Sequence, residues 1–255
     1  MKVSKYFSLS LLAFGLVSFS QAAETSAIRL GAGIDYSSGK YGSSDTVSQL
    51  YVPLSVAYST SVGALKLTVP YVRVDGPADL IDENNVFISG VDSTRSGLGD
   101  VVLSGVLYDV ISSDASDFNV DLGAKVKFGT ADETQGLGTG EMDYSLQLDL
   151  VKHFDHLALF GTIGYKQRTD PAGLDLRDVF FTEIGGDYAI AQHARVGLLF
   201  DYRPSSISGN DPVREATFYA QVSPKSGVSV QPYILAGFSD SSPDWGAGIN
   251  FGVKY

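Results

Sequence analysis

The feature that most constrains this chain is an alternation of apolar and polar residues with a period of two, in segments of about ten residues, from residue 27 to residue 255. Between residues 118 and 128 every even position is apolar, whereas Asp121, Lys125 and Lys127 occupy odd positions. Successive side chains of a β-strand point to opposite faces, so one face of such a strand is apolar and the other is polar and charged. Repeated segments of this length and pattern are typical of membrane-spanning strands.

The pattern predicts an all-β, single-chain antiparallel transmembrane β-barrel of about 12 strands, an even number as in bacterial barrels. Longer connections follow the odd-numbered strands and short turns follow the even-numbered ones, as expected for external loops and periplasmic turns. The amino and carboxy termini of the barrel would then both lie on the periplasmic side. The predicted strands span residues 27–36, 47–58, 64–75, 99–110, 117–128, 141–154, 157–168, 178–190, 193–204, 213–223, 227–239 and 245–255.

Aromatic residues of the apolar phase gather at both ends of the predicted strands, where amphipathic rings favour the two membrane–water boundaries. The last residue, Tyr255, also belongs to this phase and resembles the carboxy-terminal assembly signal of outer-membrane barrels. The external group comprises Tyr36, Tyr71, Phe128, Tyr144, Tyr165, Phe180, Tyr202, Phe238 and Trp245, and the periplasmic group comprises Tyr58, Phe118, Phe154, Tyr188 and Tyr255.

A secreted β-sandwich or a lipocalin-like barrel would also show alternating strands. In such a protein the apolar phase would fill an enclosed core and the charged phase would face water outside. The two aromatic groups, the unequal loops and the terminal aromatic residue favour the membrane barrel over this alternative.

The first residues have the features of an export signal. Lys2 and Lys5 precede an apolar stretch of about 14 residues, too short to span a membrane as a helix, and small residues flank a cleavage point after Ala22. We therefore expect a signal peptide over residues 1–22 and a barrel over residues 23–255. The expected location is the bacterial outer membrane, with outer-membrane lipid and lipopolysaccharide as partners.

Composition excludes several functions. The chain has no Cys, three His and a formal net charge of -11, which argues against thiolate chemistry, a resident metal or cofactor, and binding of nucleic acid. His153, His156 and His193 fall at predicted periplasmic ends without a nucleophile motif, so we do not expect an enzyme.

The charged residues of the polar phase are the candidate pore lining. Lys125 and Lys127 share one strand, Lys166 and Arg168 share another, and the two pairs would flank Asp143 and Asp149. This arrangement fits either a constriction that selects by charge or the neutralisation of buried carboxylates, Asp149 included. The full set is Arg29, Lys66, Asp121, Lys125, Lys127, Asp143, Asp149, Lys166, Arg168, Glu183, Arg195, Asp201, Arg203 and Glu215.

Three further features lead to expectations. The loop 76–98 is the longest, and it would act as a gate inside the lumen or as an external lid. Acidic residues crowd the external loops, where they would hold divalent cations next to lipopolysaccharide or simply be solvated. Pro53, Pro70 and Pro232 lie within predicted strands, where each removes a hydrogen-bond donor, so we expect bulges or strand ends there.

Seven stretches of the sequence carry a resemblance to a known family: 97–105, 125–132, 136–140, 144–149, 173–176, 200–203 and 238–246. They resemble transporter-like outer-membrane proteins of the MetA-pathway of phenol degradation family. The resemblance covers roughly residues 97–255, and the family's name implies uptake of aromatic compounds. We therefore expect a channel or uptake protein for small solutes, aromatic or hydrophobic ones included; the alternative is a non-conducting structural or adhesive barrel with acidic, ion-binding loops.

Overall fold

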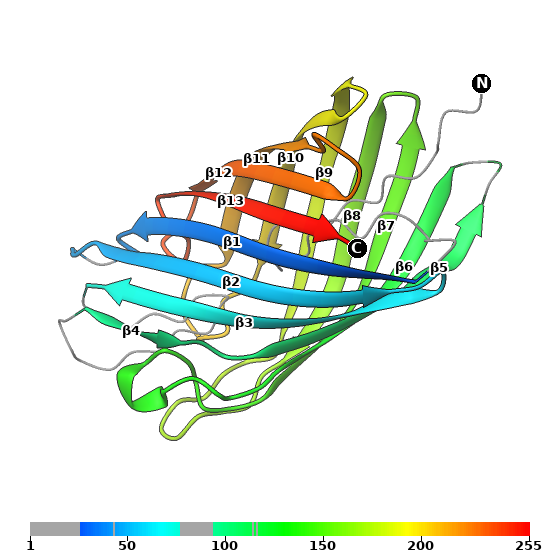
Figure 1. Cartoon of the computed structure of the whole chain (residues 1–255). Helices are drawn as coiled ribbons and strands as arrows, with labels where there is room; N and C mark the ends of the chain where they lie inside the picture. The colour runs from blue at the N-terminus through cyan, green and yellow to red at the C-terminus, as the bar shows by residue number, and fades with distance from the viewer. Residues whose placement is uncertain (1–25, 43, 77–93, 114, 116) are drawn as a thin grey trace.

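The computed structural model describes residues 26–42, 44–76, 94–113, 115 and 117–255, and these form a closed antiparallel β-barrel whose strands are strongly tilted (Figure 1). The observed strands agree with the predicted ones to within three residues at most ends, apart from the fourth. Their bounds are β1 Ala27–Gly39, β2 Val47–Ser59, β3 Gly63–Asp75, β4 Arg95–Leu98, β5 Val102–Ser113, β6 Phe118–Lys127, β7 Asp143–Phe154, β8 Leu157–Gln167, β9 Val179–Ala191, β10 Ala194–Arg203, β11 Val213–Val222, β12 Val228–Gly237 and β13 Trp245–Lys254.

The barrel closes where β1 meets β13. Strands that are neighbours in the chain pair with each other, except that β4 and β5 both pair with β3. The first and last strands, β1 and β13, pair antiparallel from Arg29–Lys254 to Ser38–Trp245. At the end of this seam Ile28 and Tyr255 exchange two backbone hydrogen bonds, of 3.3 and 2.8 Å. Among the described strands every one except the short β4 pairs on both sides, and a closed ladder is the condition for a sheet to stand in lipid.

At the fourth strand position the prediction of a single strand is wrong. Instead of one strand over 99–110, β4 and β5 follow each other along β3, separated by residues 99–101. Residues 95–98, expected to belong to the long loop, are the strand β4. The rest of the expected gate, residues 77–93, lies outside the described residues, as do residues 1–25 with the expected signal peptide. The barrel therefore has twelve strand positions and thirteen strand segments.

The three prolines lie inside strands at gaps in the pairing rather than at strand ends. Pro53 and Pro70 face each other across β2 and β3. The β1–β2 register passes from Ala32–Leu54 to Asp35–Tyr51 beside Pro53, and the β4–β5 break lies beside Pro70. Pro232 sits where the β11–β12 register passes from Tyr219–Tyr233 to Val222–Val230. Each missing N–H thus coincides with a local loosening of the ladder.

The predicted apolar face is the outer one. Leu146 is 56% exposed, Leu198 42% and Ile163 61%, whereas their chain neighbours on the other phase are buried or half-buried. Both aromatic groups are confirmed, with Trp245 51% and Tyr188 51% exposed, although Phe118 and Phe128 are half-buried. A soluble barrel with an enclosed apolar core is excluded by this orientation. Among the described residues no helix is long and apolar enough to cross a membrane.

Four inward-facing rings lie flat against the barrel wall. Each of the four sits on an inward glycine that is its register partner on the adjacent strand, close enough that a Cβ on the glycine would overlap the ring. Rings held sideways in this way take up less of the central space than rings pointing at the barrel axis. The pairs are Phe181 on Gly164, Phe160 on Gly185, Tyr219 on Gly197 and Tyr233 on Gly248.

Candidate functional site

None of the fourteen charged residues expected to line the pore is exposed, as their phase along the strands requires. Eight are buried: Lys66, Lys127, Asp143, Lys166, Arg168, Glu183, Asp201 and Arg203. Six are half-buried: Arg29, Asp121, Lys125, Asp149, Arg195 and Glu215. In a single-layer barrel with an exposed apolar outer face, these side chains stand on the inner face.

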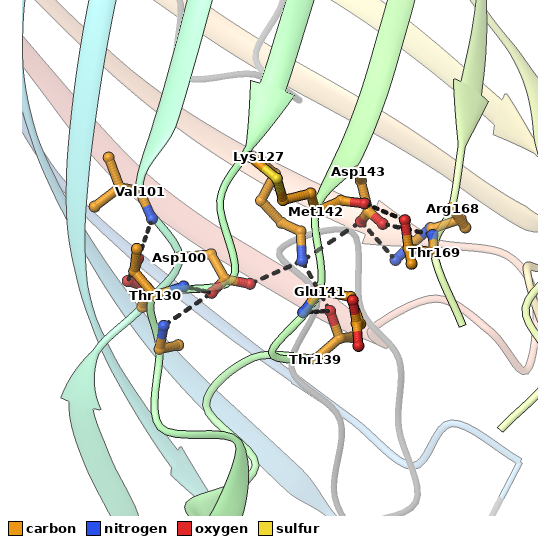
Figure 2. Close-up of polar contacts among 12 residues, drawn as sticks. Asp100, Val101, Lys127, Thr130, Thr139, Glu141, Met142, Asp143, Arg168 and Thr169 are labelled. Atoms are coloured by element: carbon orange, nitrogen blue, oxygen red, sulfur yellow. Dashed lines mark hydrogen bonds and ion pairs between the residues drawn. The ribbon is translucent and has the colours of Figure 1, made fainter. Parts of the chain in front are cut away.

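The strands bring Lys127 and Arg168 to either side of Asp143, near the external end of the lumen (Figure 2). Lys127 Nζ lies 3.5 Å from Asp143 Oδ2, and Arg168 Nη1 lies 3.4 Å from the same atom. Lys127 Nζ also lies 2.9 Å from Asp100 Oδ2 and donates to Thr139 Oγ1 at 2.9 Å. The two cations therefore neutralise a buried carboxylate pair, which is the second of the two readings that their spacing left open.

Asp100 fastens an external loop to the barrel wall. It sits in the break between β4 and β5, only 4% exposed, and accepts hydrogen bonds from the backbone N–H groups of Thr130 (3.0 Å) and Ala131 (2.9 Å). Further along this loop Leu137 is 1% exposed. We call residues 128–142 the docked loop, because Asp100 and Lys127 hold it against the barrel wall (Figure 2).

Two further ion groups lie on the inner face. Arg195 contacts Asp187, which also accepts a hydrogen bond from Tyr219 Oη at 3.3 Å, towards the periplasmic end. In the external half Arg203 lies 2.5 Å from Asp201, and its Nη2 lies 3.5 Å from Glu215 Oε1. At these positions of the inner face, cationic and anionic side chains thus stand next to each other instead of forming a region of one sign.

Asp149 is held mainly by neutral donors. Gln147 Nε2 donates to it at 2.9 Å and Thr162 Oγ1 at 2.6 Å, while Lys125 interacts with it electrostatically. Of the two cationic pairs predicted to flank Asp149, only Lys125 is seen to interact with it.

A cavity of about 200 Å³ occupies the external half of the lumen. Six of the predicted residues line it: Lys125, Lys127, Asp143, Lys166, Arg203 and Glu215. The remaining lining includes Asp35 and Asp100, the hydroxyls of Ser104 and Ser145, and an apolar set made of Tyr51, Pro53, Pro70, Val72, Tyr233 and Leu235. Charge and apolar surface therefore share one chamber.

Several residues of the inner face were not predicted from the sequence pattern. Asp100 falls two residues before Val102, in phase with Ser104, and that phase was the only available signal. Asp187 is the carboxylate partner of Arg195, and only the strand register reveals the pair. Apolar residues also point inward, since Val151, Phe160 and Leu199 form a buried cluster.

The described part of the acidic external loops is fixed by internal hydrogen bonds. Hydrogen bonds from the Thr134 and Gln135 side chains lower the pKa of Asp132, which caps the short 3-10 helix Glu133–Gln135. The Tyr165 hydroxyl and the Arg168 backbone N–H likewise lower the pKa of Asp178. No cluster of three or more His, Asp or Glu side chains in the described ranges is arranged to hold a metal ion.

The three histidines lie at the end opposite the cavity, as their positions predict. His153 is the last residue but one of β7 and donates its backbone N–H to the Asp117 carbonyl at 3.0 Å. His156 lies in the following turn, with its ring 6.1 Å from that of Tyr188. His193 is in the turn between β9 and β10.

The fold is shared with known outer-membrane barrels. The COG4313 outer membrane channel from Pseudomonas putida F1 superimposes with a TM-score of 0.74 at 13% identity, over 100% of both chains. The KdgM porin matches with a TM-score of 0.49 at 11% identity, over 89% of this chain and 98% of that one. The Pseudomonas putida toluene transporter TodX matches with a TM-score of 0.42 at 10% identity, over 91% and 89%. No curated protein sequence matches significantly.

The closed barrel and its apolar outer belt place the protein in the bacterial outer membrane. Residues 43–255 match the family described as "Putative MetA-pathway of phenol degradation". The match begins well before residue 97, where the visible resemblance starts, and takes in β2 and β3. This chain therefore belongs to that family.

Proposed function

We propose that this protein is an outer-membrane channel that passes small solutes, aromatic or hydrophobic ones included, through a narrow charged lumen, and that it is not an enzyme. The observation that carries the proposal is the cavity in the external half of the barrel, which combines ionic side chains with tyrosine, proline and aliphatic surface. A barrel of twelve strands is wider than the eight-stranded barrels that side chains fill, and narrower than the porins with broad aqueous channels.

The inner face suits selection of a small solute better than free passage of water-sized ions. Several of its charges are held in ion pairs, so a passing solute meets fixed dipoles and apolar patches beside them. The flattened rings of Phe160, Phe181 and Tyr219 leave room beside them while keeping the wall apolar in places.

The direct test is electrical. The full chain, folded into planar lipid bilayers, should give discrete current steps, and proteoliposomes should swell in isotonic solutions of small aromatic or short-chain organic solutes. A matched preparation of the same chain left unfolded in denaturant and diluted identically is the control for leakage caused by detergent.

Absence of both current and solute flux above that control would overturn the proposal. A non-conducting structural or adhesive barrel would then remain, and its acidic loops would become the part to study.

A further inference from the structure

Lysine and serine alternate in a single row across five neighbouring strands of the inner wall. The register joins Lys66 on β3 to Ser104 on β5, Ser104 to Lys125 on β6, Lys125 to Ser145 on β7, and Ser145 to Lys166 on β8. We call these five residues the lysine–serine row. Directly opposite residues of an antiparallel pair have Cβ atoms about 5 Å apart, so a hydroxyl stands between each two ammonium groups.

Four consecutive members of the row line the cavity: Ser104, Lys125, Ser145 and Lys166. Lys66 ends the row and is 4% exposed, and Lys166 is 6% exposed. Ammonium and hydroxyl groups are all hydrogen-bond donors, so the four members that line the cavity present one continuous donor surface to it. Such a surface complements a carboxylate, whose oxygens are acceptors only.

The carboxylates next to the row are already engaged. Asp143 is held between Lys127 and Arg168 and accepts from the Thr169 backbone N–H at 3.3 Å. Asp100 is held by Lys127 and by two backbone N–H groups of the docked loop. In the row and the strand positions just above it, five cations therefore stand with these two acids, and Asp149, further along β7, interacts with Lys125.

Away from the row the cavity lining contains apolar surface. The strand β12 stands six positions from β6 in the ring of twelve, and it contributes Tyr233 and Leu235. The strand β2, next to β3, adds Tyr51 and Pro53. Polar groups share this side: Asp35, Gln49, Arg203, Glu215 and Asn250. The two acids of this side are matched locally, since the Tyr233 hydroxyl donates to Asp35, and Glu215 lies 3.5 Å from Arg203.

We infer that the lysine–serine row is an anion-binding site, and that the solute for which this chamber is built is a small aromatic carboxylate. Its carboxylate would accept hydrogen bonds from the row, and its ring would pack on the tyrosine and proline surface away from the row. A volume of about 200 Å³ fits a single-ring acid better than a drug-sized ligand. The inference rests on the proposed channel function, because a closed barrel would have no solute.

The test is block of single-channel current by benzoate, with benzamide as the neutral analogue of the same shape and acetate as the anion without a ring. Wild-type protein should be blocked by benzoate at concentrations where benzamide and acetate have little effect. In the double variant Lys125→Gln/Lys166→Gln the benzoate concentration for half block should rise about tenfold or more, which is a loss of at least one charge-assisted contact.

Two further variants keep the result interpretable. Lys125→Arg preserves the charge and should retain most of the block, and Lys225→Gln removes a lysine from an exposed periplasmic turn and should behave as wild type. Heat-modifiable migration in electrophoresis reports whether each variant has folded. If the double variant does not fold, the single variants are measured in its place, each with an expected rise of several-fold.

The outcomes separate the two claims. Current that benzoate and benzamide block equally, or that the double variant leaves unchanged, overturns the anion site while the channel function stands. Wild-type protein that gives no current and no solute flux overturns the channel function, and the anion site falls with it.

Discussion

The ring of Tyr219 on β11 lies on Gly197 of β10, and its hydroxyl donates to Asp187 at 3.3 Å. The glycine makes room for the ring, and the ring in turn carries a hydroxyl to a carboxylate that Arg195 also contacts. A tyrosine that would otherwise point across the lumen is thus turned along the wall, and a missing side chain on one strand positions a side chain on the next.

The first prediction concerns this pair. Gly197→Ala places a Cβ inside the space of the Tyr219 ring, and overpacking of this kind costs about 1–3 kcal/mol. We expect a lower urea midpoint in detergent and altered conductance, since the ring must move into the lumen. In the Tyr219→Ala background the same substitution should cost much less. Equal costs in the two backgrounds would show that the ring and the glycine are independent.

The second prediction concerns the docked loop. Asp100→Asn leaves Lys127 with a weaker acceptor in a buried site, and breaking one partner of a buried ion pair costs about 3–5 kcal/mol. Because the loop contains Glu133 and Glu141, its release should expose it to a glutamate-specific protease. The matched control is Asp45→Asn in a different external loop. Unchanged cleavage in Asp100→Asn would mean that Asp100 does not hold the loop.

The third prediction is the pH dependence of the β8–β9 loop. The Tyr165 hydroxyl and the Arg168 N–H lower the pKa of Asp178, so the ionised carboxylate is favoured in the folded protein. Its stabilising effect is complete above the ordinary pKa of an aspartate and is lost as the pH falls through the lowered value. Asp178→Asn should remove this part of the acid sensitivity, measured as thermal midpoint against pH from 2 to 7. Because the side chain is exposed, the effect should be small.

The fourth prediction tests the lipid-facing surface. Leu148, 45% exposed near the middle of β7, should contact acyl chains. An arginine at the bilayer midplane of a barrel costs about 2–4 kcal/mol, so Leu148→Arg should make the free energy of folding into vesicles less favourable by that amount. Val62→Arg, at a 69% exposed position in a periplasmic turn, is the control and should change little. A neutral result at Leu148 would contradict the membrane placement.

The strands were predictable because their information is local. Alternation around Lys125 or Leu198 depends only on the pleat, so the inward and outward phases, the loop lengths and most strand ends follow from the chain itself. The strand break at Gly99–Val101 was not predictable, because it depends on Pro70 of the neighbouring strand, which lacks the donor that an unbroken ladder requires.

The site was predictable only in part for a related reason. The inner phase identifies Lys127 and Asp143, but the pairing of Lys127 with Asp100 requires the loop, the strand break and the register together. The lysine–serine row is likewise invisible along the chain, since its members are about 20 to 40 residues apart and only the register aligns them. Apolar inner residues such as Phe160 were missed because a lumen was expected to be polar throughout.

The hydrogen bonds between Ile28 and Tyr255 connect residues at opposite ends of the barrel sequence. Every other strand contact can form as soon as a neighbouring hairpin exists, whereas this one must wait for the most distant partner and carries the largest loop-closure entropy. Until it forms, β1 and β13 are edge strands with unpaired backbone groups, which can pair with other chains in lipid or in the periplasm. Assembly of the barrel should therefore end at this junction, and chaperones that shield it during transit would protect the chain from aggregation.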